Sequence, residues 1–273
     1  MIRSSFIFLD GVRFQKEKML WSQGIKNWDD FLNAKNISGI GALAKYHHSR
    51  QIMKARENLY ALNSECFKKI IPQAEHWRLY EFFKEEAIFL DIETTGLDFE
   101  SNINVIGLFD GINTKIMIRG INLDYKILQK ELLNYKLIVT FNGAAFDVPF
   151  LKKRYPNLLP DVPHFDLKHC CARLGLTGGL KEIEKQLGIE RKNDIVKEFH
   201  GGDAAVLWRM YRATGDDYYL NLLIEYNEED TINLRFIADF VYTELKKRTL
   251  EDSIEKFVCK SPQELVSPLQ GKG

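Results

Sequence analysis

The sequence predicts a mixed α/β domain, with helices flanking a partly antiparallel sheet, behind a smaller helical region. Short β-rich runs bounded by Gly, Asn or Asp lie between about residues 87 and 143. One helical segment separates the third run from the fourth, and helical patterns fill most of the remainder. Adjacent strands followed by a crossover helix and another strand are typical of a sheet with both antiparallel and parallel pairs.

The change in character near residue 85 predicts the domain organisation. We divide the chain into a helical N-terminal region (1–84), the α/β domain (85–250) and a polar C-terminal tail (251–273) that we expect to be partly disordered. The tail carries two prolines in its last stretch, 260–273.

The N-terminal region shows four amphipathic segments. Asn27 is expected to cap the start of the second, and Gly24 to follow the end of the first. Apolar residues near helical spacing predict one long helix in the third. The four predicted helices span residues 12–24, 27–34, about 43–70 and 76–86.

Residues 8–32 resemble a helix-hairpin-helix element, which binds nucleic-acid backbones through turn amides. The expected turn has the pattern Gly-hydrophobic-Gly, but here Gly11 and Val12 are followed by Arg13. The missing second glycine weakens amide-mediated phosphate binding, and in this interpretation Arg13 would be a substitute contact for phosphate. A packing module for the larger domain explains the segment equally well.

The α/β domain reads as four strands and a series of helices. Four runs rich in β-branched and apolar residues predict strands at 87–94, 103–111, 114–120 and 137–143. Pro149 interrupts or opens the helix after the fourth strand. Helical periodicity covers 124–135, 144–155, 164–175, 178–188, 204–215 and 216–248.

The amino-acid composition does not indicate whether the protein binds nucleic acid. The 273 residues include 38 basic and 38 acidic side chains, so a nucleic-acid partner requires local basic patches or bound cations. The first apolar stretch is too short for a signal peptide, and no apolar run is long enough to span a membrane. The four cysteines show no zinc-like spacing with histidine, so we expect free thiols in a reducing cytoplasm.

Two carboxylates stand near the end of the first predicted strand. Asp91 and Glu93 are two residues apart, so they project from the same face. Carboxylates on a half-buried strand repel each other and lose hydration unless cations neutralise them. All-oxygen ligands favour a divalent cation such as Mg²⁺ or Mn²⁺. Taken alone, the pair is also consistent with a strand that simply ends in a turn capped by Asp91.

A second acidic feature follows the fourth strand. Asn142 stands at the strand end, and Asp147 lies in the next helical turn among apolar neighbours such as Phe146 and Phe150. A lone acid in this setting needs a partner, or it caps a helix.

The third feature lies on the last predicted helix. Tyr226 and Asp230 are four residues apart and share a face that also carries leucines, so this face points inward. Glu228 and Glu229 are expected to be solvated. A buried Tyr bonded to an Asp is the ordinary structural explanation. Together, however, four acids and a tyrosine that converge at one end of a sheet suit metal-assisted attack of water on a phosphodiester.

The three features resemble the motifs of the DEDD superfamily of 3′–5′ exonucleases. The first motif is DIETTGL (91–97), the second NGAAFDVPFL (142–151) and the third YNEED (226–230). The tyrosine four residues before the last acid indicates the tyrosine type (DEDDy), because the histidine type has His where this chain has Glu225. Segments at 164–175, 178–189 and 204–211 are similar to the YprB-like group of uncharacterised exonucleases.

The resemblance implies a ribonuclease H-like fold, two Mg²⁺ or Mn²⁺ ions and a role for each matched residue. Asp91, Glu93 and Asp230 would bind one metal, and Asp91 would bridge to a second ion held by Asp147. Tyr226 would orient the attacking water by a hydrogen bond, since a tyrosine does not ionise near neutral pH. The 3′-terminal nucleotide would contact Thr94, Thr95, Leu97, Asn142 and Phe146.

Basic residues suggest where phosphates bind. Lys181 follows a Gly-Gly turn that has a counterpart in the YprB-like group, and we expect it to contact substrate. Runs at 152–154, 191–192 and 246–248 are more often solvated helix ends than phosphate contacts.

These observations predict a metal-dependent 3′–5′ exonuclease that acts on single-stranded DNA or RNA ends, in the cytoplasm. One alternative is a catalytically silent nucleic-acid-binding module of the same fold, although all the acids are retained. Another is a structure-selective endonuclease. The lack of a glycine-rich loop after the first strand argues against a Rossmann-type nucleotide binder.

Overall fold

The computed structural model describes the whole chain except residues 97, 99, 200–201 and 259–273, and the side chains of residues 194 and 251–258. Cys259 and the predicted polar stretch 260–273 therefore lie outside the described residues. Cys66, Cys170 and Cys171 are free thiols.

A mixed sheet forms the centre of the larger domain, as the sequence predicted, but it has five strands where four were expected. Its order is β3-β2-β1-β4-β5, so β1 lies in the middle. β1 pairs antiparallel with β2 and parallel with β4, while β2–β3 is antiparallel and β4–β5 parallel. The strands are β1 (Ala87–Thr94), β2 (Ile103–Phe109), β3 (Thr114–Ile118), β4 (Leu137–Thr140) and β5 (His164–Asp166).

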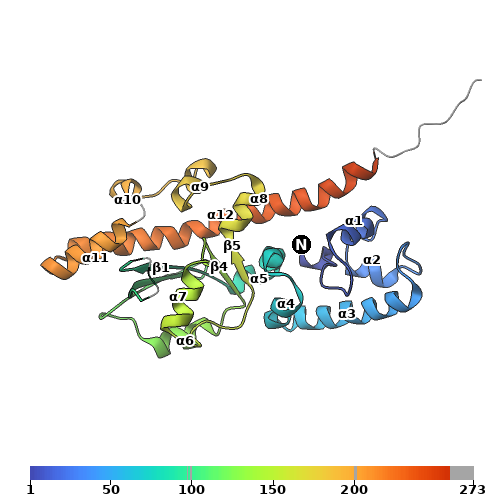
Figure 1. Ribbon diagram of the computed structural model, residues 1–273, viewed down its shortest axis with the longest axis horizontal. Coiled ribbons are helices and arrows are strands. Elements are labelled where there is room, and N and C mark those ends of the chain that lie inside the picture. The colour runs from blue at the N-terminus through green and yellow to red at the C-terminus, as the bar shows by residue number, and fades with distance from the viewer. Residues whose placement is uncertain (97, 99, 200–201, 259–273) are drawn as a thin grey trace, which may run out of the picture.

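Helices cover both faces of this sheet. On one face, α12 (Asp217–Val258) crosses the strands, and α8 (Leu167–Leu174), α9 (Leu180–Leu187) and α11 (Asp203–Thr214) pack beside it. On the other face lie α6 (Tyr125–Leu132) and α7 (Asp147–Arg154), which Figure 1 shows beneath the sheet. The alternation of β1 sends Phe89 toward α12, and Leu90 toward α6 and α7.

The N-terminal region is helical and joins the core of the α12 face. Phe6, Leu20 and Trp28 belong to the same buried cluster as Phe89 and Leu234. This region contains α1 (Phe14–Ser22), α2 (Trp28–Asn33), α3 (Ala42–Tyr60), α4 (Ser64–Ile70) and α5 (Tyr80–Phe83). Short 3-10 segments complete it at Ile2–Ser4, Gln73–Leu79 and Lys84–Glu86.

The capping residues of the first two helices are confirmed. The Asn27 side chain accepts hydrogen bonds from the backbone of Asp29 and Asp30, and Asp30 accepts one from the Asn27 backbone in return. Gly24 follows α1 with a left-handed φ of 85°. Gly11 and Val12, the predicted turn, precede α1, and Arg13 is its exposed N-cap residue. Nucleic-acid binding by this segment stays a prediction.

The prediction of a single helix over 43–70 is wrong. α3 ends at Tyr60, and Leu62 adopts a left-handed φ of 54° before α4 begins at Ser64. The apolar spacing continues across the break because Leu59 and Phe67 bury against the same cluster. The spacing of apolar residues therefore reflects contact with the shared core and does not reveal the break between α3 and α4.

Three further elements differ from the prediction. The segment predicted as a helix over 164–175 starts with β5, and only its second part forms α8. A short helix, α10 (Asp194–Glu198), was not predicted. α12 is continuous across residue 250 and ends at Val258. Pro149 is the third residue of α7, where a missing backbone donor removes no helical bond.

Within the described part of the chain, no helix combines the length and the apolar character that a membrane span requires.

A candidate metal centre between the first strand and the last helix

β1 presents Asp91 and Glu93 to the face covered by α12. Ile92 points between them to the opposite face, where it joins the cluster that contains α6 and α7 side chains. The register of the β1–β2 pair places Asp91 opposite Gly107, and it shifts between Glu93 and Thr94. The strand therefore carries its two acids in the centre of the sheet, under the last helix.

Gly107 allows α12 to approach this part of the sheet. A Cβ atom at this position would lie 2.0 Å from Asn227 Oδ1 and 2.9 Å from Thr231 Cγ2. Asn227 is fully buried, and its Nδ2 donates a hydrogen bond of 2.7 Å to Asp91 Oδ2. The contact joins α12 directly to the first acid, one residue after Tyr226.

Three carboxylates meet at this point. Asp91, Glu93 and Asp230 each offer one oxygen, and the three oxygens lie within 4.8 Å of one another. Asp91 and Glu93 are half-buried, whereas Asp230 is buried. Clustered carboxylate oxygens are the ligands that Mg²⁺ and Mn²⁺ prefer. The donor set therefore fits a divalent metal.

Asp147 lies beside this triad. It is the first residue of α7 and is 4% exposed, and its Oδ1 accepts a hydrogen bond of 3.1 Å from the Ile92 backbone. Its charge contributes to the raised pKa values of Asp91 and Glu93, so it is close to both. The structure thus brings together the four acids that the sequence singled out.

The pKa values of these acids are raised in the absence of a cation. Burial is the largest cause in each case, and for Asp91 and Glu93 the neighbouring carboxylates raise the pKa further. Burial raises the pKa of Asp147 to about 7 and that of Asp230 to about 6, although Arg191 opposes the latter shift. Ionised, the four acids hold negative charge in excess of the Arg191 cation that pairs with Asp230, and a divalent cation would neutralise this excess.

Tyr226 lies half-buried one turn before Asp230. Burial and then the charge of Asp230 raise the pKa of its hydroxyl well above the ordinary value, so it stays protonated near neutral pH. The ring is flanked by Phe199 at 6.1 Å between centroids, by Lys181 Nζ at 5.2 Å and by Arg191 Cζ at 5.5 Å from its centroid. The phenol is therefore available as a hydrogen-bond donor.

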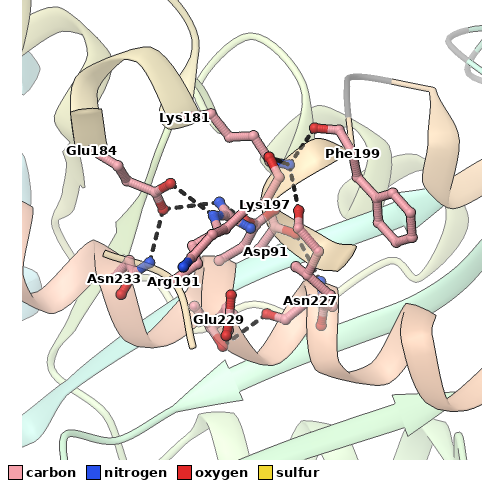
Figure 2. A network of polar contacts seen from close by, with 12 residues as sticks. Asp91, Lys181, Glu184, Arg191, Lys197, Phe199, Asn227, Glu229 and Asn233 are labelled. Atoms are coloured by element: carbon pink, nitrogen blue, oxygen red, sulfur yellow. Dashed lines mark hydrogen bonds and ion pairs between the residues drawn. The ribbon is translucent and has the colours of Figure 1, made fainter. Parts of the chain in front are cut away.

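Arg191 was expected to be solvated, and this expectation is wrong. It is 6% exposed, and its Nε and Nη2 donate to Glu184 Oε2 and Oε1 at 2.8 and 2.9 Å. Nη2 also donates to Asp230 Oδ1. Asn233 Nδ2 donates to Glu184 Oε1 at 2.9 Å, which completes the network in Figure 2.

The sequence did contain a signal for this network. Glu184 lies four residues after Leu180 and one after Ile183, so it occupies the apolar face of α9. A carboxylate on that face requires a buried cation, and Arg191 is the nearby candidate.

The loop that carries Arg191 is fixed to α12. Glu229 accepts hydrogen bonds from the backbone of Lys192 (2.8 Å) and Asn193 (3.1 Å), and the Asn193 side chain donates to Glu225. Glu229, expected to be solvated, is half-buried because it supports this loop. The other acid expected in solvent, Glu228, is also half-buried and accepts a hydrogen bond from Thr114.

The loop of the second motif is held by Asp166, which sequence reasoning missed. Asp166 accepts hydrogen bonds from the backbone of Asn142 (3.0 Å) and Ala144 (2.9 Å). Asn142 has a left-handed φ of 66°, which asparagine tolerates better than most residues. At Gly143 a Cβ would lie 2.2 Å from Thr140 Oγ1, so the turn is too tight for a side chain.

The predicted substrate contacts surround the acids in different ways. Thr94 is buried and its hydroxyl donates to the Gly96 carbonyl at 2.6 Å, whereas Thr95 is exposed and accepts from the Asn102 backbone at 3.0 Å. Phe146 is half-buried, with its ring 5.2 Å from that of Phe150. Leu97 lies outside the described residues.

Lys181 lies at the site but is already engaged. Its ammonium donates to the carbonyls of Val196 at 2.7 Å, Lys197 at 3.4 Å and Phe199, at the C-terminal end of α10. Lysine at this position satisfies helix-end carbonyls. Contact with a substrate phosphate stays a prediction.

Comparison with known proteins assigns the family. Residues 88–242 match the model of the RNase_H superfamily. The chain is also similar to the uncharacterized protein YprB of Bacillus subtilis (strain 168), with 28% identity over 193 residues, 62% of this chain and 44% of that protein. The chain thus spans less than half the length of this relative. Because the family match covers more than half of the chain and contains all four acids and Tyr226, the chain belongs to the RNase_H superfamily, whose members are generally nucleases that use divalent metals.

Proposed function

We propose that this protein is a metal-dependent 3′–5′ exonuclease of the tyrosine type. It would hydrolyse phosphodiester bonds at single-stranded nucleic-acid ends and release nucleoside 5′-monophosphates. The observation that carries the proposal is the meeting of Asp91, Glu93 and Asp230 within 4.8 Å, with Asp147 beside them and Tyr226 one helical turn from Asp230.

The donor set supports divalent cations. Two Mg²⁺ or Mn²⁺ ions would supply an activated water and charge stabilisation at the phosphate. Asp91, Glu93 and Asp230 would hold one ion, and Asp91 and Asp147 the other. The raised pKa values of these acids also support a bound cation, because burial without one favours the neutral forms of the carboxyl groups.

Tyr226 acts by position in this proposal. Its hydroxyl keeps its proton at neutral pH, so it cannot serve as the base and instead donates a hydrogen bond that orients the attacking water. The half-buried ring is held between Phe199 and the two cationic side chains, which limits its rotation.

The 3′-terminal nucleotide would lie along the loops that follow β1 and β4. Phe146 offers an aromatic face for base stacking, a contact worth about 1–3 kcal/mol per base in single-strand binding proteins. The other proposed contacts are Thr94, Thr95, Leu97, Asn142 and Lys181.

The test uses single-stranded DNA and RNA oligonucleotides labelled at the 5′ end, with Mg²⁺, Mn²⁺ or EDTA. The wild type should produce a metal-dependent ladder that shortens from the 3′ end, and Asp147→Ala should abolish it. Asp161→Ala is the matched control, because Asp161 is exposed and pairs with Lys68 away from the cluster. The ladder would also identify the preferred sugar.

Other outcomes would replace the proposal. Tight binding without cleavage of either oligonucleotide would indicate a silent binding module. Cleavage of a circular single strand, which has no 3′ end, would indicate an endonuclease. Metal-independent cleavage would contradict the assignment of the acids.

A further inference from the structure

The ion pair of Arg191 and Glu184 lies next to the carboxylate cluster and is closed to solvent. The side chains are each 4% exposed, and two hydrogen bonds join them in a bidentate arrangement. Burying such a pair costs hydration, which good geometry and additional hydrogen bonds must offset. Asn233 supplies one additional bond to Glu184. The burial of this ion pair therefore suggests that it has a role at the neighbouring carboxylate cluster.

Arg191 contacts Tyr226 and Asp230, the first and last residues of the third motif. Its Nη2 is shared between Glu184 Oε1 and Asp230 Oδ1, and its Cζ lies 5.5 Å from the centroid of the Tyr226 ring. Among the described residues, the buried Nη1 has no hydrogen-bond partner. One guanidinium therefore fixes an oxygen of Asp230 and covers the tyrosine ring, and it leaves the second Asp230 oxygen without a contact from Arg191.

The charge of the pair is the second observation. Arg191 and Glu184 sum to zero, so the pair orients Asp230 without neutralising it. A lone arginine at the same place would compete with a metal ion for Asp230, because both are cations that bind the same carboxylate. With Glu184 present, the charge of Asp91, Glu93 and Asp230 remains available to a metal.

We propose that Arg191 is a positioning residue for Asp230 and Tyr226, and that Glu184 balances its charge so that it does not displace a metal cation. This inference rests on the proposed function, since it assigns Asp230 to a metal. It makes separate predictions for metal affinity, which depends on net charge, and for turnover, which depends on geometry.

Four variants separate the two effects: Arg191→Met, Glu184→Gln, the double variant with both changes, and Arg173→Met as the control. Arg173 also pairs with a glutamate (Glu75, 3.2 Å) and lies over an aromatic ring (Trp77, 5.7 Å), but it is on α8. The Mn²⁺ affinity is measured by the electron paramagnetic resonance signal of free Mn²⁺. Turnover is measured on a labelled oligonucleotide at saturating Mn²⁺.

Glu184→Gln should weaken Mn²⁺ binding by at least about tenfold, because it leaves an unbalanced positive charge against Asp230. Arg191→Met should bind Mn²⁺ no more weakly than the wild type, but its kcat should fall on the order of 100-fold as Asp230 and Tyr226 lose their support. The double variant should regain Mn²⁺ affinity to within about threefold of the wild type and keep the low kcat. Arg173→Met should match the wild type in both measurements.

Unchanged Mn²⁺ affinity in Glu184→Gln would overturn the charge-balancing role, and unchanged kcat in Arg191→Met would overturn the positioning role. Circular dichroism and thermal unfolding show which variants are folded. If Arg191→Met does not fold, the kcat of the double variant tests the positioning role, because the double variant leaves no buried unpaired charge. If the wild type hydrolyses no oligonucleotide, the proposed function fails, whereas the order of the Mn²⁺ affinities still tests the pair.

Discussion

Gly107→Ala tests whether the approach of α12 to the sheet sets the geometry of the site. The new methyl group would lie 2.0 Å from Asn227 Oδ1 and 2.9 Å from Thr231 Cγ2, and both residues are fully buried. Gly107 does not have a positive φ, so its backbone accepts alanine. In a strand without this contact the change would stabilise the protein by roughly 0.5–1 kcal/mol. Here we predict that the steric clash outweighs this gain and that Gly107→Ala lowers the stability of the protein.

The magnitude follows from the contact. Asn227 would have to move by more than about 1 Å to restore ordinary van der Waals separation. Overpacking of this kind costs roughly 1–3 kcal/mol, and loss of the hydrogen bond from Asn227 to Asp91 adds a comparable amount. Tyr226 and Asp230 lie on either side of Asn227 on the same helix, so they move with it. A displacement of about 1 Å lowers kcat roughly 100-fold.

The assay combines urea unfolding with single-turnover cleavage of a 5′-labelled oligonucleotide. Gly107→Ala should lose about 2–4 kcal/mol of stability, and the folded protein should lose about 100-fold in rate. Gly41→Ala is the control, because Gly41 is exposed at the start of α3 with nothing within 4 Å of its virtual Cβ. Wild-type turnover in folded Gly107→Ala would refute the reasoning that this glycine sets the distance between helix and strand.

Three further predictions concern single groups. Without metal, in EDTA, burial raises the pKa of Asp147 to about 7, above its value in the unfolded chain. The folded protein therefore holds a proton on Asp147 at low pH, which stabilises it against unfolding, and this contribution is lost as the pH rises through 7. Urea unfolding should show the wild type losing up to about 4 kcal/mol relative to Asp147→Asn between pH 4 and 8. In the N-terminal region, Arg78 Nη1 pairs with Glu17 Oε1 at 2.9 Å, and both side chains are buried. Arg78→Met should destabilise the protein by roughly 3–5 kcal/mol, because it leaves Glu17 buried without its cation, and adding Glu17→Gln should recover most of the loss in the same measurement. Tyr226→Phe should keep the Mn²⁺ affinity measured by calorimetry but lower the single-turnover rate on the order of 100-fold, because only the hydroxyl is removed.

Each prediction has a distinct contrary result. Parallel pH profiles for the wild type and Asp147→Asn would show that Asp147 does not hold a proton in the fold. Equal stability of the wild type and Arg78→Met would show that Glu17 finds another partner. An unchanged rate for Tyr226→Phe would remove the hydroxyl from the proposed mechanism.

The sequence predicted four of the five strands, and which functional side chains share a face, because these features have local signatures. Each of the first four strands is a short apolar run with a turn at its end, and Asp91 and Glu93 share a face by simple alternation. Tyr226 and Asp230 share a face by helical spacing. These patterns require no knowledge of distant contacts.

The elements that were missed lack such signatures. β5 has only three residues, too few to show a period, and it forms because β4 offers a parallel edge. The turn at Leu62 interrupts a spacing that remains helical on both sides. A single sequence does not show where a helix breaks when both of its halves pack on the same core.

The network around the site is non-local as well. Gly107 appears in the sequence as one glycine in an apolar strand, and its role appears only when α12 crosses β2. Arg191 appears in a basic run, but Glu184 and Asp230 bury it from two different helices. The apolar face of α9 signals that Glu184 needs a buried cation, but the contact of Arg191 with Asp230 on α12 is established only by the tertiary structure.

The most direct test of the central claim is an anomalous difference map from crystals grown with MnCl₂ and a nucleoside 5′-monophosphate. The proposal predicts manganese peaks between Asp91, Glu93 and Asp230 and between Asp91 and Asp147, with the nucleotide phosphate against both. A map without manganese at these carboxylates, while the nucleotide is bound and Mn²⁺ is in excess, would contradict it.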